Sequence, residues 1–191
     1  MKVALFGHSY IRDLARLGFH NIKVSDDVVL DLRYFSFPGH TFADFLVDPS
    51  KFQEVIQFQP NIIVVYLGGN DIKVDVELQQ VYSDCKKFYE YLRSRLPDTY
   101  IIASQIEARY GSTVNRHGSP EAAEFSRLAN YFNKWLLKQS FKDRLLCIKG
   151  PNKLSNSALY RDTVHLTRQG LHKLFDIIKC VVTDTVLYRL N

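Results

Sequence analysis

The chain alternates between near-continuous apolar runs and longer segments in which apolar residues recur every three or four positions. Runs of the first kind, at residues 3–6 and 61–67, are typical of buried strands in a parallel sheet. Segments of the second kind form helices with one apolar face. The longest such pattern has its apolar positions at Leu78, Val81, Cys85, Phe88 and Leu92. The alternation of the two patterns indicates an α/β fold.

The same pattern, followed along the chain, predicts five strands, each followed by one or more helices. The strands are expected at residues 3–6, 27–37, 61–67, 99–104 and 144–149. The helices are expected at residues 11–17, 41–46, 49–58, 78–92, 119–136 and 167–182. Repeated strand–helix order with right-handed crossovers gives one parallel sheet covered on both faces. We therefore expect residues 1–191 to form a single domain, a three-layer α/β/α sandwich with a central five-stranded parallel sheet.

Composition narrows the class of protein without changing this fold. The chain has 191 residues, 46% hydrophobic and 24% charged, which is ordinary for a globular domain. No apolar run is long enough to span a bilayer, and the N-terminal run is too short for a signal peptide. The three cysteines have neither metal-ligand spacing nor a disulfide pattern. We expect reduced cysteines in an intracellular, cytoplasmic protein, or in a domain of a longer one.

Charge is distributed unevenly along the chain. Residues 1–100 contain 11 Lys and Arg against 13 Asp and Glu, whereas residues 101–191 contain 14 against 7. A basic half can bind RNA or an anionic membrane surface. It can equally be a solvated surface, and the absence of a Lys/Arg run interleaved with aromatic residues favours this simpler interpretation.

Residues suited to acyl transfer follow four of the predicted strands. The segments are Gly-His-Ser at 7–9, Pro-Gly-His-Thr at 38–41, Gly-Gly-Asn-Asp at 68–71 and Asp-Thr-Val-His at 162–165. The carboxyl ends of parallel strands lie at one edge of a sheet, so these loops meet there. Acyl transfer needs a nucleophile, a base, a group that orients the base, and donors for an oxyanion. All four kinds of group are present at this edge.

Each residue alone has a simpler structural explanation. Ser9 suits the N-cap of the following helix, Gly39 and Asn70 suit turns, Asp162 suits a loop, and His165 suits a buried position. Their joint occurrence at one predicted edge favours the catalytic interpretation.

The four blocks, in this order and approximate spacing, resemble the SGNH (GDSL-like) hydrolase family, which is named for its Ser, Gly, Asn and His. The resemblance covers nearly the whole chain and implies a flavodoxin-like SGNH hydrolase fold that needs no metal or organic cofactor. It implies that Ser9 is the nucleophile, His165 the base and Asp162 the residue that orients His165. It also implies an oxyanion hole made by the backbone N–H groups of Ser9 and Gly39 and the side chain of Asn70.

One residue departs from the family's first block, in which an aspartate usually precedes the serine. Here that position is His8, which we expect to alter hydrogen bonding around Ser9. A long loop at 106–118 is expected to overhang the site, with Arg109 and Tyr110 as candidate substrate contacts beside His8. A surface loop without a role is the equal alternative for this segment.

Two functions follow from these observations. The first is a serine esterase that acts on short acyl esters, above all acetyl esters, or on small lipids. The second is a non-catalytic SGNH-fold module that binds RNA, a membrane or a protein partner through the basic C-terminal half. Within the family, the compact size and the Gly-His-Ser-Tyr opening resemble esterase domains in the first open reading frame protein of LINE-type retrotransposons. That resemblance implies a parent protein that handles RNA. The sequence does not indicate an oligomeric state.

Overall fold

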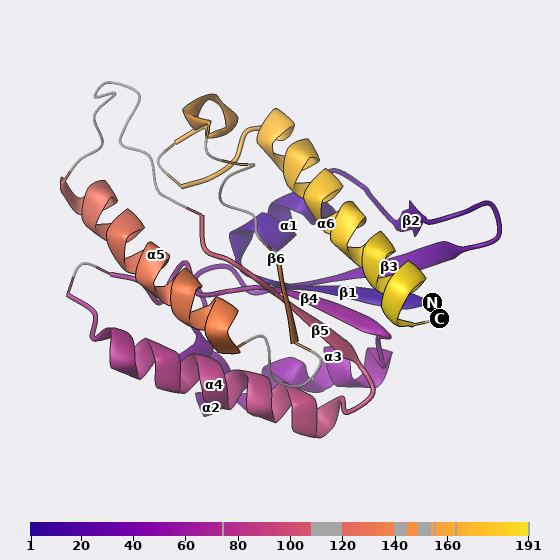
Figure 1. The fold of residues 1–191 in the computed structure, drawn as a ribbon, viewed down its shortest axis with the longest axis horizontal. Helices are drawn as coiled ribbons and strands as arrows, with labels where there is room; N and C mark the ends of the chain where they lie inside the picture. The colour runs from indigo at the N-terminus through magenta and orange to yellow at the C-terminus, as the bar shows by residue number, and fades with distance from the viewer. Residues whose placement is uncertain are drawn as a thin grey trace.

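One twisted sheet forms the centre of the molecule (Figure 1). The computed structural model describes residues 1–73, 75–107, 120–139, 145–148, 154, 156–162 and 164–190. Within these residues, six strands are ordered β2-β3-β1-β4-β5-β6. The strands are β1 (Lys2–Gly7), β2 (Asn21–Lys23), β3 (Val29–Ser36), β4 (Ile62–Tyr66), β5 (Tyr100–Ser104) and β6 (Leu145–Ile148). All pairs of neighbours are parallel except β2 and β3, which are antiparallel.

The predicted α/β sandwich is confirmed, and the expected five-stranded parallel sheet needs one correction. The five predicted strands are all present, but β2 adds a sixth strand and makes the sheet mixed. This strand has three residues, of which Ile22 alone is buried. One buried side chain produces no periodicity, which is why the pattern of apolar positions did not predict this strand.

Helices cover both faces of the sheet and complete the three layers (Figure 1). Helices α1 (Ser9–Ala15) and α6 (Arg168–Arg189) lie on one face. The other face is covered by α2 (Phe42–Val47), α3 (Gln53–Phe58), α4 (Leu78–Arg95) and α5 (Pro120–Gln139). Two 3-10 turns, at Pro49–Phe52 and Ser157–Leu159, complete the described elements. Of the helices described, none has both the length and the apolar composition to cross a membrane.

The alternating side chains of β1 contribute to two separate cores. Val3 and Leu5 pack under α1 and α6, whereas Ala4 and Phe6 face the four helices on the other side. All four side chains are fully buried, as expected for a central strand. Four aromatic rings surround Phe6, those of Phe45, Phe37, Phe52 and Phe88, with centroids 5.0, 5.3, 5.6 and 6.0 Å away.

The strand order places a crevice at the carboxyl ends of β1 and β4. The five parallel strands follow the flavodoxin-like order, in which the connections from the central strand lead to opposite sides of the sheet. Ligands bind at this switch point in open α/β sheets. The two strand ends approach closely, because a Cβ atom on Gly7 would lie 2.2 Å from the Tyr66 carbonyl oxygen. Only glycine fits there, and it brings Ser9 close to the loop that follows β4.

Candidate active site

Ser9 is the first residue of α1 and directly follows the turn at the end of β1. Its side chain is half-buried and lines a pocket at the switch point. Among the described residues, neither its hydroxyl nor its backbone N–H has a hydrogen-bond partner. The helix N-terminus also favours negative charge here. A hydroxyl and a backbone N–H group are therefore both available at this residue.

His8, and not Ser9, is the N-cap of α1. The His8 Nδ1 atom accepts a long hydrogen bond of 3.5 Å from the Tyr10 backbone N–H. The simpler interpretation of Ser9 as an N-cap is therefore wrong. The imidazole takes a capping position that suits aspartate, because a ring nitrogen can accept a hydrogen bond as a carboxylate oxygen does. This leaves the Ser9 hydroxyl free for another role, and His8 also lines the pocket.

Gly39 lies in a tight turn after β3. The His40 backbone N–H donates to the Phe37 carbonyl at 3.2 Å, and Pro38 and Gly39 are the two central residues. Gly39 has a φ of +82°, the value that the second central residue of a type II turn requires. Proline followed by glycine is the sequence typical of that turn.

The loop after β4 holds this turn in place. The Asn70 side-chain amide donates to the His40 carbonyl at 3.0 Å, and the Phe42 backbone N–H donates to Asp71 at 2.9 Å. Asn70 lines the same pocket as Ser9, whereas Gly39 is exposed and lies outside the pocket lining. Burial of Asp71 raises its pKa to about 7, although the Phe42 N–H opposes this shift. The side chains of Asn70 and Asp71 thus connect the loop after β4 to the loop after β3.

Asp162 and His165, the residues expected to act as orienting acid and base, form a hydrogen-bonded pair. The His165 Nδ1 atom lies 2.9 Å from the Asp162 Oδ2 atom. The other carboxylate oxygen accepts the backbone N–H groups of Val164 and His165, at 2.7 and 2.6 Å. Partial burial would raise the pKa of Asp162, but these hydrogen bonds and the His165 ring outweigh it and lower the pKa. The carboxylate therefore stays ionised and orients the ring.

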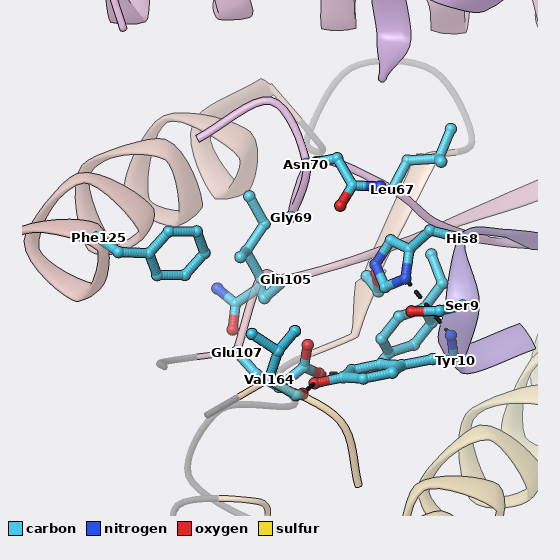
Figure 2. Close-up of a pocket in the computed structure, with 13 residues that line it drawn as sticks. His8, Ser9, Tyr10, Leu67, Gly69, Asn70, Gln105, Glu107, Phe125 and Val164 are labelled. Carbon is cyan, nitrogen blue, oxygen red and sulfur yellow. Dashed lines mark hydrogen bonds between the residues drawn. The ribbon is translucent and has the colours of Figure 1, made fainter. Parts of the chain in front are cut away.

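Figure 2 shows how the pocket brings several of these residues together. Ser9 and His8 approach from the end of β1, Asn70 from the loop after β4, and Val164 from the opposite side. His165 directly follows Val164 but makes no hydrogen bond to Ser9. In structures without substrate, such bonds are often loose and tighten only in the complex. Of the predicted residues, His8, Ser9 and Asn70 thus line one pocket, whereas Gly39, Asp162 and His165 lie outside its lining.

Polar residues that were not predicted as site residues lie at the end of β5. Glu107 is buried in the pocket wall and accepts a hydrogen bond of 2.7 Å from the Tyr66 hydroxyl. Burial raises the pKa of Glu107 to about 7. Ser104 also lines the pocket, and its buried hydroxyl has no hydrogen-bond partner among the described residues. The feature of the sequence that could have indicated Ser104 and Glu107 is their position at the carboxyl end of a predicted strand.

Arg109 and Tyr110, which were expected to contact substrate, lie outside the described residues. The same holds for most of the expected loop at 106–118, of which Ile106 and Glu107 are described. Both of these residues line the pocket.

The fold and the sheet edge at which these residues gather define a class, the carboxylic ester hydrolases of the SGNH type. The chain belongs to the GDSL-like Lipase/Acylhydrolase family, whose sequence model matches residues 7–173. The match begins at the glycine two positions before Ser9 and extends past His165, so it includes all four sequence blocks. The chain is therefore an ester hydrolase, and its family implies small acyl esters as substrates.

Solved structures support the fold. The chain superposes on the acetyl xylan esterase AlAXEase with a TM-score of 0.69 and 17% identity, covering 95% of this chain and 100% of that one. For a lipase/acylhydrolase from Enterococcus faecalis the TM-score is 0.64 with 17% identity, covering 95% of each chain. For an acetyl-xylooligosaccharide esterase from Geobacillus Stearmophilus the TM-score is 0.66 with 16% identity, covering 93% of this chain and 91% of that one. No curated protein matches the chain in sequence.

Proposed function

We propose that the protein is a serine esterase in which Ser9, His165 and Asp162 form the catalytic triad. The observation that supports this most directly is the Asp162–His165 pair, bonded at 2.9 Å on a loop that packs against the helix beginning at Ser9. Asp162 holds Nδ1 protonated, so that Nε2 is the nitrogen that takes the Ser9 proton. His165 then returns this proton to the leaving alcohol.

The oxyanion that forms when Ser9 attacks the ester carbonyl needs N–H donors. We assign this role to the backbone N–H groups of Ser9 and Gly39 and to the Asn70 side chain. Asn70 has two amide hydrogens, and the bond to the His40 carbonyl uses one of them. That bond also fixes the amide plane before substrate binds, which is the preorganisation that makes such donors effective.

Short acyl groups, acetyl above all, are the substrates that we propose. The pocket beside Ser9 is lined by bulky side chains, among them Tyr66, Ile106 and Phe125. Two of the structural neighbours are described as esterases of acetylated xylan or xylooligosaccharide. Hydrolysis of p-nitrophenyl acetate, butyrate and octanoate tests this proposal, with the highest kcat/KM expected for acetate. A preference for octanoate would contradict it.

Three variants test the triad. Ser9→Ala and His165→Ala should each lower kcat by roughly 10⁶, as in other serine hydrolases. Asp162→Asn should lower it by roughly 10⁴, since the ring then takes the wrong tautomer. The alternative function, a non-catalytic module that binds through the basic half, predicts equal rates for Ser9→Ala and the wild type. It also predicts an RNA affinity that falls steeply with salt.

A further inference from the structure

The residue that directly follows Ser9 reaches the loop of the acid and the base. The Tyr10 hydroxyl donates a hydrogen bond of 2.5 Å to the backbone carbonyl of Val164, which lies 154 positions away in the sequence. Val164 directly precedes His165. The Tyr10 side chain is buried, so its ring cannot move far from this partner. One hydrogen bond thus connects the helix of the nucleophile to the loop of the base.

A second link joins the same two elements. Arg161 Nη2 lies 3.3 Å from an oxygen of Asp13, a buried residue of α1. Tyr10 and Asp13 are three positions apart and therefore share a face of the helix. Arg161 directly precedes Asp162, just as Val164 directly precedes His165. The two links therefore hold the acid–base pair from both sides.

The loop between these links is internally bonded. The Arg161 N–H donates to the His165 carbonyl at 2.8 Å, and the Thr167 N–H donates to the Leu159 carbonyl at 2.7 Å. The Asp162 carboxylate accepts two backbone N–H groups of the same loop. A segment bonded in this way shifts as a unit. Fixing it at two points on α1 therefore fixes the His165 ring relative to Ser9.

We propose that Tyr10 and Arg161 are positioning residues that hold the acid–base loop in register with the nucleophile. This inference rests on the proposed triad. Neither residue needs to touch the substrate, because the Tyr10 hydroxyl and the Arg161 guanidinium are turned toward the other element. Misplacement of a reacting group by about 1 Å can lower a rate by roughly 10². Loss of the links should therefore lower kcat and leave KM unchanged.

Tyr10→Phe tests the first link, and the chain offers a matched control. The Tyr34 hydroxyl also donates to a backbone carbonyl, that of Phe19, at 2.5 Å, and it lies outside the pocket. Tyr10→Phe and Tyr34→Phe should lower the melting temperature by similar amounts. Tyr10→Phe alone should lower kcat, by about tenfold, which is the loss expected from one hydrogen bond of typical net strength. An unchanged kcat in Tyr10→Phe, or equal losses in the two variants, would overturn the proposal.

Arg161→Gln tests the second link without leaving a buried charge alone, because Arg12 and Arg16 still contact Asp13. Combined with Tyr10→Phe, it should lower kcat by about a hundredfold. A double variant no slower than Tyr10→Phe would remove Arg161 from the proposal.

Hydrogen exchange separates this proposal from the catalytic one, because it needs no turnover. The backbone amides of 160–166 should exchange faster in Tyr10→Phe than in the wild type or Tyr34→Phe. Equal exchange in all three proteins would overturn the link even if the esterase function holds. A Ser9→Ala variant as active as the wild type would instead overturn the triad, whatever the exchange shows.

Discussion

The Ser9 backbone and the Asn70 side chain bring N–H donors to one pocket from two adjacent strands. The Ser9 N–H has no partner among the described residues because the first N–H groups of a helix lack an intrahelical acceptor, and the His8 side chain caps Tyr10 instead. Asn70 keeps one amide hydrogen because the His40 carbonyl accepts the other. Each of these N–H groups is thus fixed in place and still available to a ligand. At the scale of single residues, the site is prepared by these supporting bonds.

Asn70→Ala should lower kcat by roughly 10²–10³, about 3–4 kcal/mol of transition-state stabilisation, with little change in KM. Charge develops on the carbonyl oxygen only as Ser9 attacks, so the lost bond weakens the transition state more than the bound ester. Steady-state kinetics on the purified variant measures this loss.

Asn61→Ala is the control for Asn70→Ala. The Asn61 side chain accepts the Lys2 backbone N–H at 2.8 Å, just before β4 and at the opposite edge of the sheet. Asn61→Ala also removes one hydrogen bond between an asparagine side chain and the backbone, but away from the pocket, so we expect normal kcat. A folded Asn70→Ala protein with the same kcat as Asn61→Ala would exclude the oxyanion role.

Asp71→Asn should stabilise the protein, and the gain should grow with pH. Burial raises the pKa of Asp71 to about 7 in the folded state, whereas its ordinary value is 3.8. The folded protein therefore holds the proton more tightly, and this contribution to stability is lost as pH rises from about 4 to 7. Asparagine cannot ionise, and its carbonyl oxygen can still accept the Phe42 N–H. Urea unfolding at pH 5 and pH 8 should show the gain increasing by about 2 kcal/mol. A gain independent of pH would contradict this pKa.

Single residues also mark the limit of what the sequence predicts. Four of the site residues follow a strand end or precede a predicted helix, namely Ser9, Asn70, Asp162 and His165. Because loops at the carboxyl ends of parallel strands lie at one edge of the sheet, the sequence is enough to place these residues there. Glu107 follows a strand end as well, but its importance depends on burial and on its contact with Tyr66. Tyr66 is 41 positions away, and no local pattern indicates that contact.

Elements position the pocket through contacts that run between helix and strand. Asn133 of α5 is buried and makes two hydrogen bonds of 2.8 Å with the backbone of Ile106, one to its N–H and one to its carbonyl. Ile106 follows β5 and lines the pocket. Ile106 lies where the sheet ends and has no neighbouring strand among the described residues. The Asn133 side chain therefore supplies the two backbone hydrogen bonds that such a strand would make.

Asn133→Ala should lower the free energy of unfolding by about 2–4 kcal/mol, because two buried backbone groups lose their partner. It should also raise KM, since the Ile106 wall of the pocket is no longer held. Asn130→Ala is the matched control, on the exposed side of the same helix. It should change stability by less than about 0.5 kcal/mol. Urea titration of both variants measures the difference, and equal stabilities would show that the Ile106 bonds contribute little.

Helices and strands were predicted correctly where buried residues recur at regular intervals along the chain. The apolar face predicted for α4 is buried at Val81, Cys85, Phe88 and Leu92. The helix predicted from residue 167 begins there, where the Thr167 hydroxyl accepts the Gly170 N–H at 3.1 Å. Residues 49–58, predicted as one helix, form a 3-10 turn followed by α3. Asn133 was not singled out, because a polar residue between Phe132 and Leu136 gives no sign of which backbone it will meet.

At the scale of the whole molecule, strand order decides where chemistry can occur. The central strand β1 has neighbours from two different parts of the chain, β3 and β4, and the crevice lies between the ends of β1 and β4. Repeated strand–helix units predicted the parallel sheet and its active edge. They did not predict which pair of strands would flank the crevice, because strand order depends on contacts distant in sequence.

The Tyr10–Val164 bond also has a consequence for folding kinetics. Because 154 positions separate its partners, closing this contact requires most of the chain to be in place. Non-local contacts of this kind form slowly. Ser9 is synthesised among the first residues, yet His165 can take its place at the same sheet edge only after α6 has packed beside α1. In refolding from urea, esterase activity should therefore return with the slowest phase, later than the helical circular dichroism signal. Activity that returns together with the helices would mean that the acid–base loop docks early, before the sheet is complete.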